Sequence, residues 1–248
     1  MKEEYTLGYS GASITFVERR RLAINGAFFL PYLTPDMRVL DCGCGPGTLT
    51  CDLAQLLARG GVVGLDAATS QIEMAQARAA TMGLRNASFR AADVYALPFE
   101  AASFDAVFSH ALMEHLADPL AAAREFHRVL KPGGSVGLCA PDWRGFLFSP
   151  ETPELVAAVK CFTDAQNAGG GDVRCGHKLR EYALEAGFRE VKCHARYEVY
   201  DPVSEIIDLL VNKLHAMEQH GHVEVLQKWS THTSLMFAQA WVSCVGKK

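Results

Sequence analysis

Three glycines alternate with other residues in the segment VLDCGCGPGTLT, at positions 43, 45 and 47. An apolar run precedes them, and a segment with helical spacing begins near Thr48. Because glycine has no Cβ, the backbone can approach a ligand closely, and amides at a helix start can face an anion or carboxylate. The same pattern also serves plain packing of a strand against a helix, so by itself it leaves both interpretations open.

A carboxylate follows at a distance that suits a nucleoside. The segment GVVGLD ends in Asp66, roughly 20 residues beyond the glycines, where an acid at a strand end can accept both ribose hydroxyls. The spacing G-x-G-x-G differs from the dinucleotide-binding G-x-G-x-x-G because position 48 is Thr. This difference counts against an NAD-dependent oxidoreductase, which remains the alternative function.

Short β-rich runs alternate with longer helical stretches from Met37 to Val136, as in repeated β-α units around a parallel sheet. Strands are expected at 37–43, 61–66, 87–93, 104–110, 134–141, 188–200 and 237–248. Helices are expected at 48–60, 69–83, 118–134, 147–168, 176–187 and within 201–234. The basic run ERRR at 18–21 predicts a solvated helix face.

With these motifs in order, the chain resembles the class I S-adenosylmethionine-dependent methyltransferases of the small-molecule and quinone-biosynthesis type (methyltransferase type 11-like). VLDCGCGPG looks like the first motif of that family, GLD its ribose-binding acid, and AADVYALPF its adenine-binding segment. FDAVFSHALMEHLADP and RVLKPGG resemble the markers of its fourth and fifth strands. The resemblance covers residues ~37–140.

The resemblance implies an α/β fold, Rossmann-like, with a seven-stranded, mostly parallel sheet in the order 3-2-1-4-5-7-6 and an antiparallel last strand. We expect a single methyltransferase domain over 1–248. Its expected parts are an N-terminal cap segment (1–36), a cofactor-binding core (37–146) and helical lid insertions (147–170 and 201–234) that select the acceptor. The insertions carry a stripe of apolar residues that suggests an apolar substrate pocket, but ordinary core packing explains the same stripe.

The resemblance also implies S-adenosyl-L-methionine as cofactor and assigns residues to its parts. Asp41, Gly43, Cys44, Gly45, Gly47 and Ser109 would face the methionine end, with Tyr9 on its carboxylate. Asp66 would bind the ribose, Ala67 and Gln71 would flank ribose and adenine, Asp93 would accept the adenine amino group, and the Val94 amide would meet a ring nitrogen. Two alternatives remain: both acids can cap a following turn, and a glutamine in a first helical turn is often solvated.

The segment after the fourth strand lies where ligands bind in open α/β folds, and it holds candidates for a proton acceptor: His110, Glu114 and His115. Histidine has a pKa near neutrality, whereas glutamate needs burial to raise its own. His115 can instead organise the loop. An amine or thiol acceptor that is already deprotonated needs no base, whereas a hydroxyl or carbon acid needs His110 or Glu114 to take its proton, so the acceptor atom (O, N, C or S) stays open. Asp142 and Trp143 follow the fifth strand and are candidates for acceptor binding. Alternatively, Asp142 is only a loop carboxylate and Trp143 a core residue beside it.

Composition limits the partners. The formal net charge of −4, from 24 basic and 28 acidic residues, gives no basic field for nucleic acid. The opening MKEEYTLGYS lacks the pattern of a signal peptide, and no apolar run reaches the ~20 residues of a membrane span. Eight scattered cysteines fit a reducing cytoplasm and lack the paired spacing of zinc modules, so no metal is expected.

We therefore expect a cytoplasmic monomer or homodimer that methylates a small molecule, an aromatic, quinone-like or secondary-metabolite acceptor. A non-catalytic adenosylmethionine-binding module is the second alternative, because a binding motif does not establish turnover.

Overall fold

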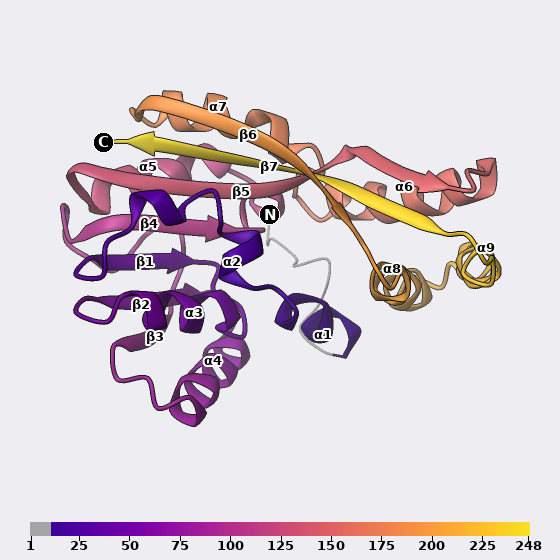
Figure 1. The fold of residues 1–248 in the computed structure, drawn as a ribbon. Coiled ribbons are helices and arrows are strands. Elements are labelled where there is room, and N and C mark those ends of the chain that lie inside the picture. The colour runs from indigo at the N-terminus through magenta and orange to yellow at the C-terminus, as the bar shows by residue number, and fades with distance from the viewer. Residues whose placement is uncertain (1–10) are drawn as a thin grey trace.

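Seven strands form one sheet in the computed structural model, which describes residues 11–248. In spatial order these are β3 (Ala87–Ala91), β2 (Gly61–Asp66), β1 (Arg38–Cys42), β4 (Phe104–His110), β5 (Leu130–Ser149), β7 (Met236–Lys247) and β6 (Arg189–Val199). The first five run parallel, and β7 pairs antiparallel with both of its neighbours (Figure 1). The predicted fold class, strand order and antiparallel last strand are confirmed.

The helices occupy both faces of this sheet and one of its ends. They are α1 (Ala12–Glu18), α2 (Leu22–Asn25), α3 (Thr48–Leu56), α4 (Thr69–Thr81), α5 (Pro119–Val129), α6 (Pro153–Ala168), α7 (Cys175–Glu185), α8 (Ser204–Ala216) and α9 (His220–Trp229), with 3₁₀ turns η1 (Leu30–Tyr32) and η2 (Met113–His115). Successive strand residues point to opposite faces: Leu40 packs in the core cluster that includes α5 and α7, whereas Val39 packs in the cluster that includes α2 and α3. The sheet is therefore covered on both sides, as its apolar central strands require.

The fifth strand is longer than predicted. We expected it to end at Pro141 and a helix to begin at 147, but β5 continues to Ser149 beyond a bulge, and α6 begins only at Pro153. The long partner β7 explains the difference, because residues 146–149 pair with 236–239 of that strand. The prolines at 150 and 153 also prevent an earlier helix, and the Thr152 hydroxyl caps α6 by accepting from the Leu155 amide at 3.2 Å.

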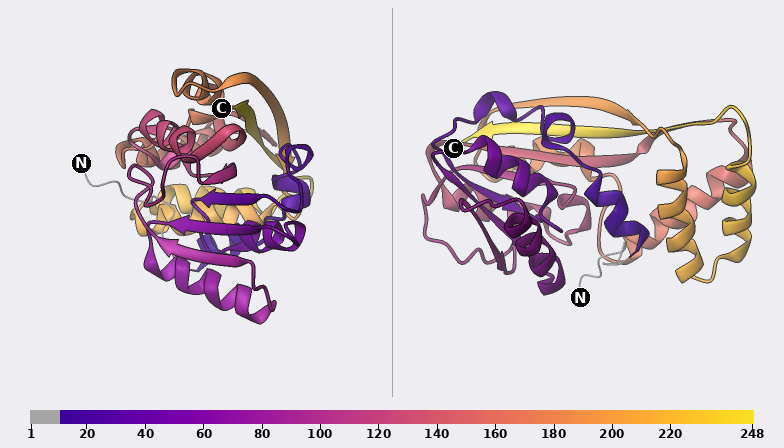
Figure 2. Two further views of the ribbon diagram at one scale, coloured as in Figure 1. Left: turned by 90° about the vertical axis from the view of Figure 1, so that its left-hand side faces the viewer. Right: turned by 60° about the horizontal axis from the view of Figure 1, so that its bottom comes forward.

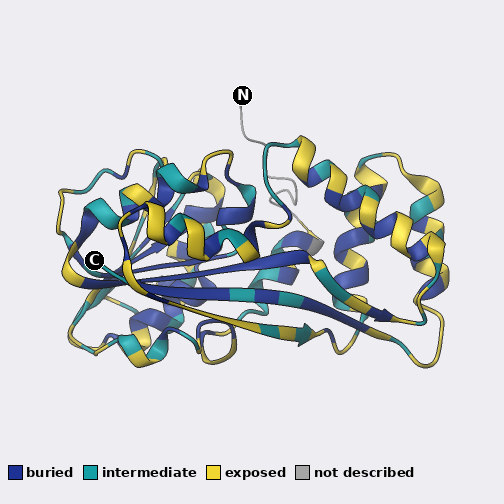
Figure 3. Cartoon of the chain, turned by 90° about the horizontal axis from the view of Figure 1, so that it is seen from above, coloured by how far each residue is buried: buried dark blue, intermediate teal, exposed yellow. Residues whose placement is uncertain are grey.

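Helices α6, α8 and α9, which we call the helical cap, pack at the far end of the long strands β5, β6 and β7 (Figures 1 and 2). Their apolar core includes Phe162, Leu210 and Trp229 and also takes in Phe16 of α1. The apolar stripe predicted from the sequence is thus mainly core, although Leu147 is exposed. Figure 3 shows exposed residues on the outward faces of the helices, buried residues along the inner strands and a largely exposed edge strand, β6.

Within residues 11–248, none of the helices combines the length and the apolar character that a membrane crossing needs.

The packing of Gly137 on β5 yields a test of the core. A Cβ at this position would lie 2.5 Å from ring carbons of the fully buried Phe29, so Gly137→Ala should lower the free energy of unfolding by about 1–3 kcal/mol. Urea unfolding followed by circular dichroism measures this loss. Gly221→Ala in α9 is the control, because its Cβ meets nothing within 4 Å and should leave the midpoint unchanged or slightly raised.

Candidate active site

The glycine turn is joined to the neighbouring strand by backbone hydrogen bonds. The Gly43 and Cys44 amides donate to the Leu65 carbonyl at 2.7 and 3.0 Å. Gly47 adopts φ 79° at the start of α3, and a Cβ there would lie 2.6 Å from the Ala75 Cβ, so its role is close packing. Gly45 differs: its added Cβ would meet nothing closer than 3.9 Å. The open space at Gly45 belongs to a cavity.

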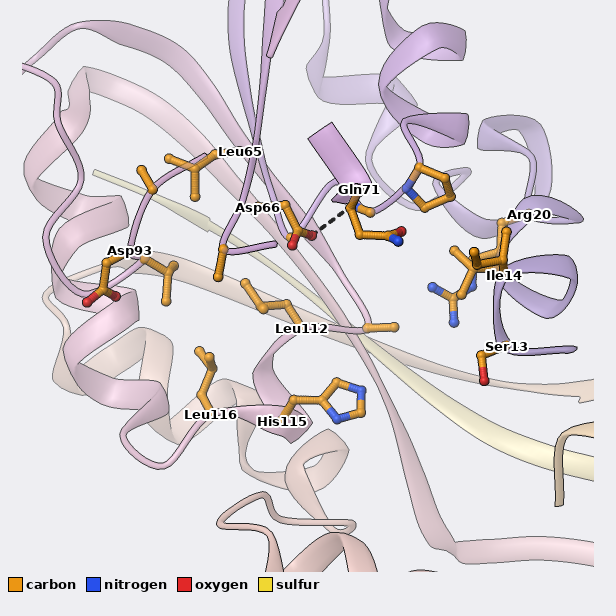
Figure 4. A pocket seen from close by; sticks show the side chains of 18 residues that line it. Ser13, Ile14, Arg20, Leu65, Asp66, Gln71, Asp93, Leu112, His115 and Leu116 are labelled. Carbon is orange, nitrogen blue, oxygen red and sulfur yellow. Dashed lines mark hydrogen bonds between the residues drawn. The ribbon is translucent and has the colours of Figure 1, made fainter. Parts of the chain in front are cut away.

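This cofactor cavity, as we name it, encloses about 190 Å³ at the carboxyl ends of β1 to β4. It gathers these predicted residues: Gly43, Gly45, Asp66, Ala67, Gln71, Asp93, Val94 and His115. Figure 4 shows Asp93 toward one end, Arg20 toward the other and Asp66 between them. Such an elongated cavity has room for a base at one end and an amino-acid moiety at the other.

Asp66 is fixed at the end of β2 by two amides. Its Oδ2 accepts from Gly45 N at 2.9 Å and its Oδ1 from Ala68 N at 3.0 Å (Figure 4). Burial raises the pKa of this carboxyl, while the two amides act in the opposite direction. Each oxygen keeps further acceptor capacity for a ligand hydroxyl.

For Gln71 and Asp93 the sequence left two interpretations open, and the structure bears on each of them. Gln71 is buried, with 4% of its surface exposed, and lines the cavity, so the solvated interpretation is wrong. Asp93 both lines the cavity and caps a turn, because its Oδ1 accepts from Tyr95 N at 2.9 Å. Tyr9 lies outside the described residues.

A smaller cavity of about 20 Å³, the methionine-end cavity, adjoins the glycine turn and is lined by Asp41, Cys44, His110 and Arg20 among others. Asp41 Oδ2 accepts from Thr50 Oγ1 at 2.6 Å, and burial raises the pKa of Asp41 to about 7. His110 stacks on Trp241 with ring centroids 4.8 Å apart, and burial lowers its pKa well below the usual range. His110 thus lines the methionine-end cavity next to the glycine turn. Ser109 is buried and lines neither this cavity nor the cofactor cavity.

A third cavity, the acceptor cavity, shares His115 and Arg20 with the cofactor cavity and is also lined by Glu114 and Trp143. Burial raises the pKa of Glu114 to about 8 and lowers that of His115 to about 3, so both are largely uncharged at neutral pH. Glu114 Oε1 and His115 Nε2 lie 3.7 Å apart, beyond hydrogen-bonding distance. Of the three predicted proton acceptors, two therefore reach the acceptor cavity.

Asp142 and Trp143 are neighbours in the sequence but have different surroundings, and only Trp143 lines a cavity. Asp142 Oδ2 lies 2.8 Å from His177 Nδ1 and accepts from its amide at 3.2 Å, and Oδ1 accepts from Arg144 N at 3.0 Å. This carboxylate ties β5 to α7 and lines none of the three cavities. Trp143 does line the acceptor cavity, against Phe162 at 5.0 Å between centroids.

Arg20 is the residue that the sequence analysis missed. The solvated face expected for 18–21 holds for the exposed Arg21 but is wrong for its neighbours. Arg19 pairs with Glu198 and Glu205, whereas Arg20 lines all three cavities and makes no ion pair within residues 11–248. A signal was present, because positions 13, 16, 17 and 20 share one helical face and three of the four are uncharged.

The helical cap is joined to the turn that carries Glu114. The Glu114 carbonyl accepts from Gln166 Nε2 at 3.3 Å and from the Asp172 amide at 2.9 Å. Gly171 lies between these donors, and a Cβ on it would be 2.4 Å from the same carbonyl oxygen. The cap and the turn that carries Glu114 are therefore in close contact.

The fold, the nucleoside-sized cavity and the acid at the end of β2 define an α/β enzyme that binds an adenosyl cofactor. Residues 33–185, more than half of the chain, match a family model described as a methyltransferase domain. The chain thus belongs to the class I S-adenosylmethionine-dependent methyltransferases, and the cofactor of that family is S-adenosyl-L-methionine.

Similar proteins span several acceptors. An uncharacterized methyltransferase of Schizosaccharomyces pombe is 31% identical over 174 residues, which cover 68% of this chain and 62% of that protein. Nocamycin O-methyltransferase of Saccharothrix syringae is 36% identical over 188 residues, 70% of this chain and 67% of that protein. A ubiquinone biosynthesis O-methyltransferase of Ruegeria pomeroyi is 41% identical over 98 residues, 40% and 38% of the two chains.

The first three curated relatives are covered over 62%, 44% and 49% of their own length, which is less than two thirds. Among solved structures, phosphoethanolamine N-methyltransferase 2 of Haemonchus contortus with S-adenosyl-L-methionine has a TM-score of 0.65 at 18% identity, covering 97% of this chain and 57% of that one. A likeness at this identity concerns the fold alone.

The contact at Gly171 provides a test of the active-site turn. Because a Cβ there would press on the Glu114 carbonyl, Gly171→Ala should displace the turn and lower kcat by about 10- to 100-fold without weakening cofactor binding. Steady-state rates and calorimetric titration with the cofactor measure the two effects.

Gly170→Ala is the matched control. Its Cβ meets nothing within 4 Å, although its φ of +96° makes alanine strained, so this variant should lose stability and keep its kcat. Equal losses of kcat in both variants would contradict a specific role for the Gly171 contact.

Proposed function

We propose that the chain transfers a methyl group from S-adenosyl-L-methionine to a small molecule whose attacking atom must lose a proton, a hydroxyl oxygen or an acidic carbon. The observation that carries this proposal is the buried Glu114 carboxyl in a cavity that adjoins the cofactor cavity at His115. An amine or thiol acceptor that arrives already deprotonated has no need of such a base, whereas a hydroxyl or a carbon acid must give up its proton in the site. Relatives named as O-methyltransferases of ubiquinone biosynthesis and of nocamycin support an oxygen acceptor.

The residues present fit the cofactor. The open space at Gly45 admits a ligand close to the backbone, and Asp66 keeps acceptor capacity for ribose hydroxyls beside it. Apolar side chains of Leu65, Val94 and Leu112 line the cavity toward Asp93, where an adenine ring would be held. The bound cofactor supplies an electrophilic methyl group on a sulfonium.

At the other end of the site, the charged residues Arg20 and Asp41 suit the carboxylate and ammonium groups of an amino acid. Arg20 has no carboxylate partner within the described chain and is suited to the methionyl carboxylate, the role first given to Tyr9. Asp41 in the methionine-end cavity is suited to the ammonium group. His110, uncharged and stacked on Trp241, then shapes this end and takes no proton from the acceptor.

Glu114 takes the proton in this scheme. Burial holds its pKa near that of a useful base, so its ionised fraction can accept the hydroxyl proton as the acceptor oxygen attacks. His115, with a pKa of about 3, is a poor proton acceptor and orients the acceptor instead. The buried walls around them exclude water and align the reacting groups, which is the main requirement of methyl transfer.

Transfer of a labelled methyl group to a panel of phenols, enols, amines and thiols tests the proposal. We expect label on the hydroxyl or carbon acids. Label only on amines or thiols would contradict the need for a base, and cofactor binding with no transfer to any compound would favour a non-catalytic module. Cytoplasmic location, the monomer or homodimer state and the extent of a single domain over 1–248 stay predictions of the sequence.

Asp66→Ala tests the ribose site. The substitution removes the acceptor for the ribose hydroxyls and releases the Gly45 amide, so cofactor binding should weaken by about 1–3 kcal/mol in calorimetric titration. Asp164→Asn on the exposed face of α6, where Asp164 pairs with Lys160, is the control and should bind normally. Unchanged affinity in Asp66→Ala would refute this site.

The pH dependence of kcat tests Glu114. The proton acceptor is the carboxylate, and the pKa of Glu114 is raised to about 8, so the rate with a hydroxyl acceptor should rise as pH approaches 8 and level off above it. Glu114→Gln should lower kcat by about 10²- to 10⁴-fold and abolish this rise, whereas cofactor affinity stays the same. A pH profile that survives in Glu114→Gln would assign the proton transfer to another group.

A further inference from the structure

Buried polar atoms on residues that line the acceptor cavity lack a hydrogen-bond partner within the described chain; they include Glu114 Oε2, Gln239 Nε2 and Trp241 Nε1. Glu114 and Gln239 are each 2% exposed. An unpaired buried donor or acceptor costs about 1–3 kcal/mol, so such atoms lining a cavity point to a ligand that supplies the missing bonds. Glu114 already has a role in the proposed reaction, and Gln239 does not.

The amide of Gln239 is held in one orientation. The Tyr200 hydroxyl donates to Gln239 Oε1 at 2.7 Å, which leaves Nε2 as the end of the amide with free hydrogens. Tyr200 is 1% exposed, and burial raises its pKa, so the phenol keeps the proton that it donates. Gln239 therefore presents a fixed donor from β7 to the cavity.

The walls around this donor are aromatic and come from separate elements. Trp143 of β5 and Phe162 of α6 lie at 5.0 Å with an angle of 50° between their planes, and Phe16 and Trp241 add two more aromatic side chains to the lining. The faces of Trp241 already contact His110 and the Arg20 guanidinium, at 4.8 and 5.6 Å. Flat apolar walls with few polar groups favour a flat ring over a flexible polar chain.

We propose that Gln239, oriented by Tyr200, is a specificity-determining residue that binds a second oxygen of an aromatic acceptor whose hydroxyl faces Glu114. The proposal rests on the proposed function and narrows the substrate class to rings that carry two oxygens. The acceptor cavity encloses only about 30 Å³ by itself, so the ring extends into the neighbouring cofactor cavity past His115 and Arg20.

The reaction balances with groups already named. The hydroxyl oxygen forms a bond to the methyl carbon, the carbon–sulfur bond breaks and its electron pair stays on sulfur. The hydroxyl proton goes to the Glu114 carboxylate and from there to solvent. Gln239 takes no part in these steps and acts only on the second oxygen.

Initial rates with catechol, resorcinol, hydroquinone and phenol test the proposal in the wild-type enzyme, Gln239→Leu and Tyr200→Phe. At least one dihydroxy compound should have a kcat/KM about tenfold or more above that of phenol, as for a site built to bond a second oxygen. Gln239→Leu should remove this preference, mainly by raising KM for the dihydroxy compound, so that kcat/KM falls by about tenfold or more for that compound and by less for phenol, and it should leave the affinity for S-adenosylhomocysteine unchanged.

Tyr200→Phe separates orientation from packing. It keeps the ring and frees the amide, so the preference should shrink in the same direction while the unfolding midpoint changes little. Gln227→Leu on the exposed face of α9 is the control and should keep the preference.

The outcomes distinguish this inference from the function on which it rests. Transfer to phenols with no preference for a second oxygen, or equal losses for phenol and diols in Gln239→Leu, overturns the role of Gln239 alone. Transfer to enols but to no phenol also overturns the role of Gln239 alone. Transfer to amines or thiols only, or to no compound at all, overturns both proposals.

Discussion

The active site depends on the hydrogen bonds that join the glycine turn to the end of β2. The Leu65 carbonyl takes two amides of the turn, and the Asp66 carboxylate takes a third from Gly45. Parallel strands bring these groups to one edge of the sheet, and the bonds fix how far the turn stands from the strand. Because the turn is fixed before any ligand arrives, the cavity beside Gly45 is preorganised and binding need not order it.

Burial determines the charges around the reaction. Glu114, His110 and His115 are each driven toward their neutral forms, and Arg20, two residues beyond the end of α1, is a cation that acts on all three. A sulfonium and an arginine would repel one another in such a medium, and a methionyl carboxylate held by Arg20, as proposed, would provide the compensating charge. The cofactor would in this way neutralise the positive charge that the protein leaves unpaired.

The sequence predicted features that depend on local pattern. The glycine turn and the acid at 66 follow from periodicity and spacing, and the strand order was implied by the resemblance to the methyltransferase family. The cavity gathers Asp66, Gln71 and Asp93 as expected. Features that depend on distant partners were not predictable. The length of β5 is set by β7, and Arg20 and Gln239 reach the site from opposite ends of the chain. The environment of Asp142 likewise depends on α7, because this carboxylate contacts His177 of that helix.

The shared carbonyl of Glu114 has a consequence for how this scaffold diversifies. One backbone oxygen receives donors from α6 and from the loop behind it, so the helical cap also bears on Glu114, the proposed proton acceptor. Exchange of the helical cap for another would therefore change the reactivity of the site together with its selectivity.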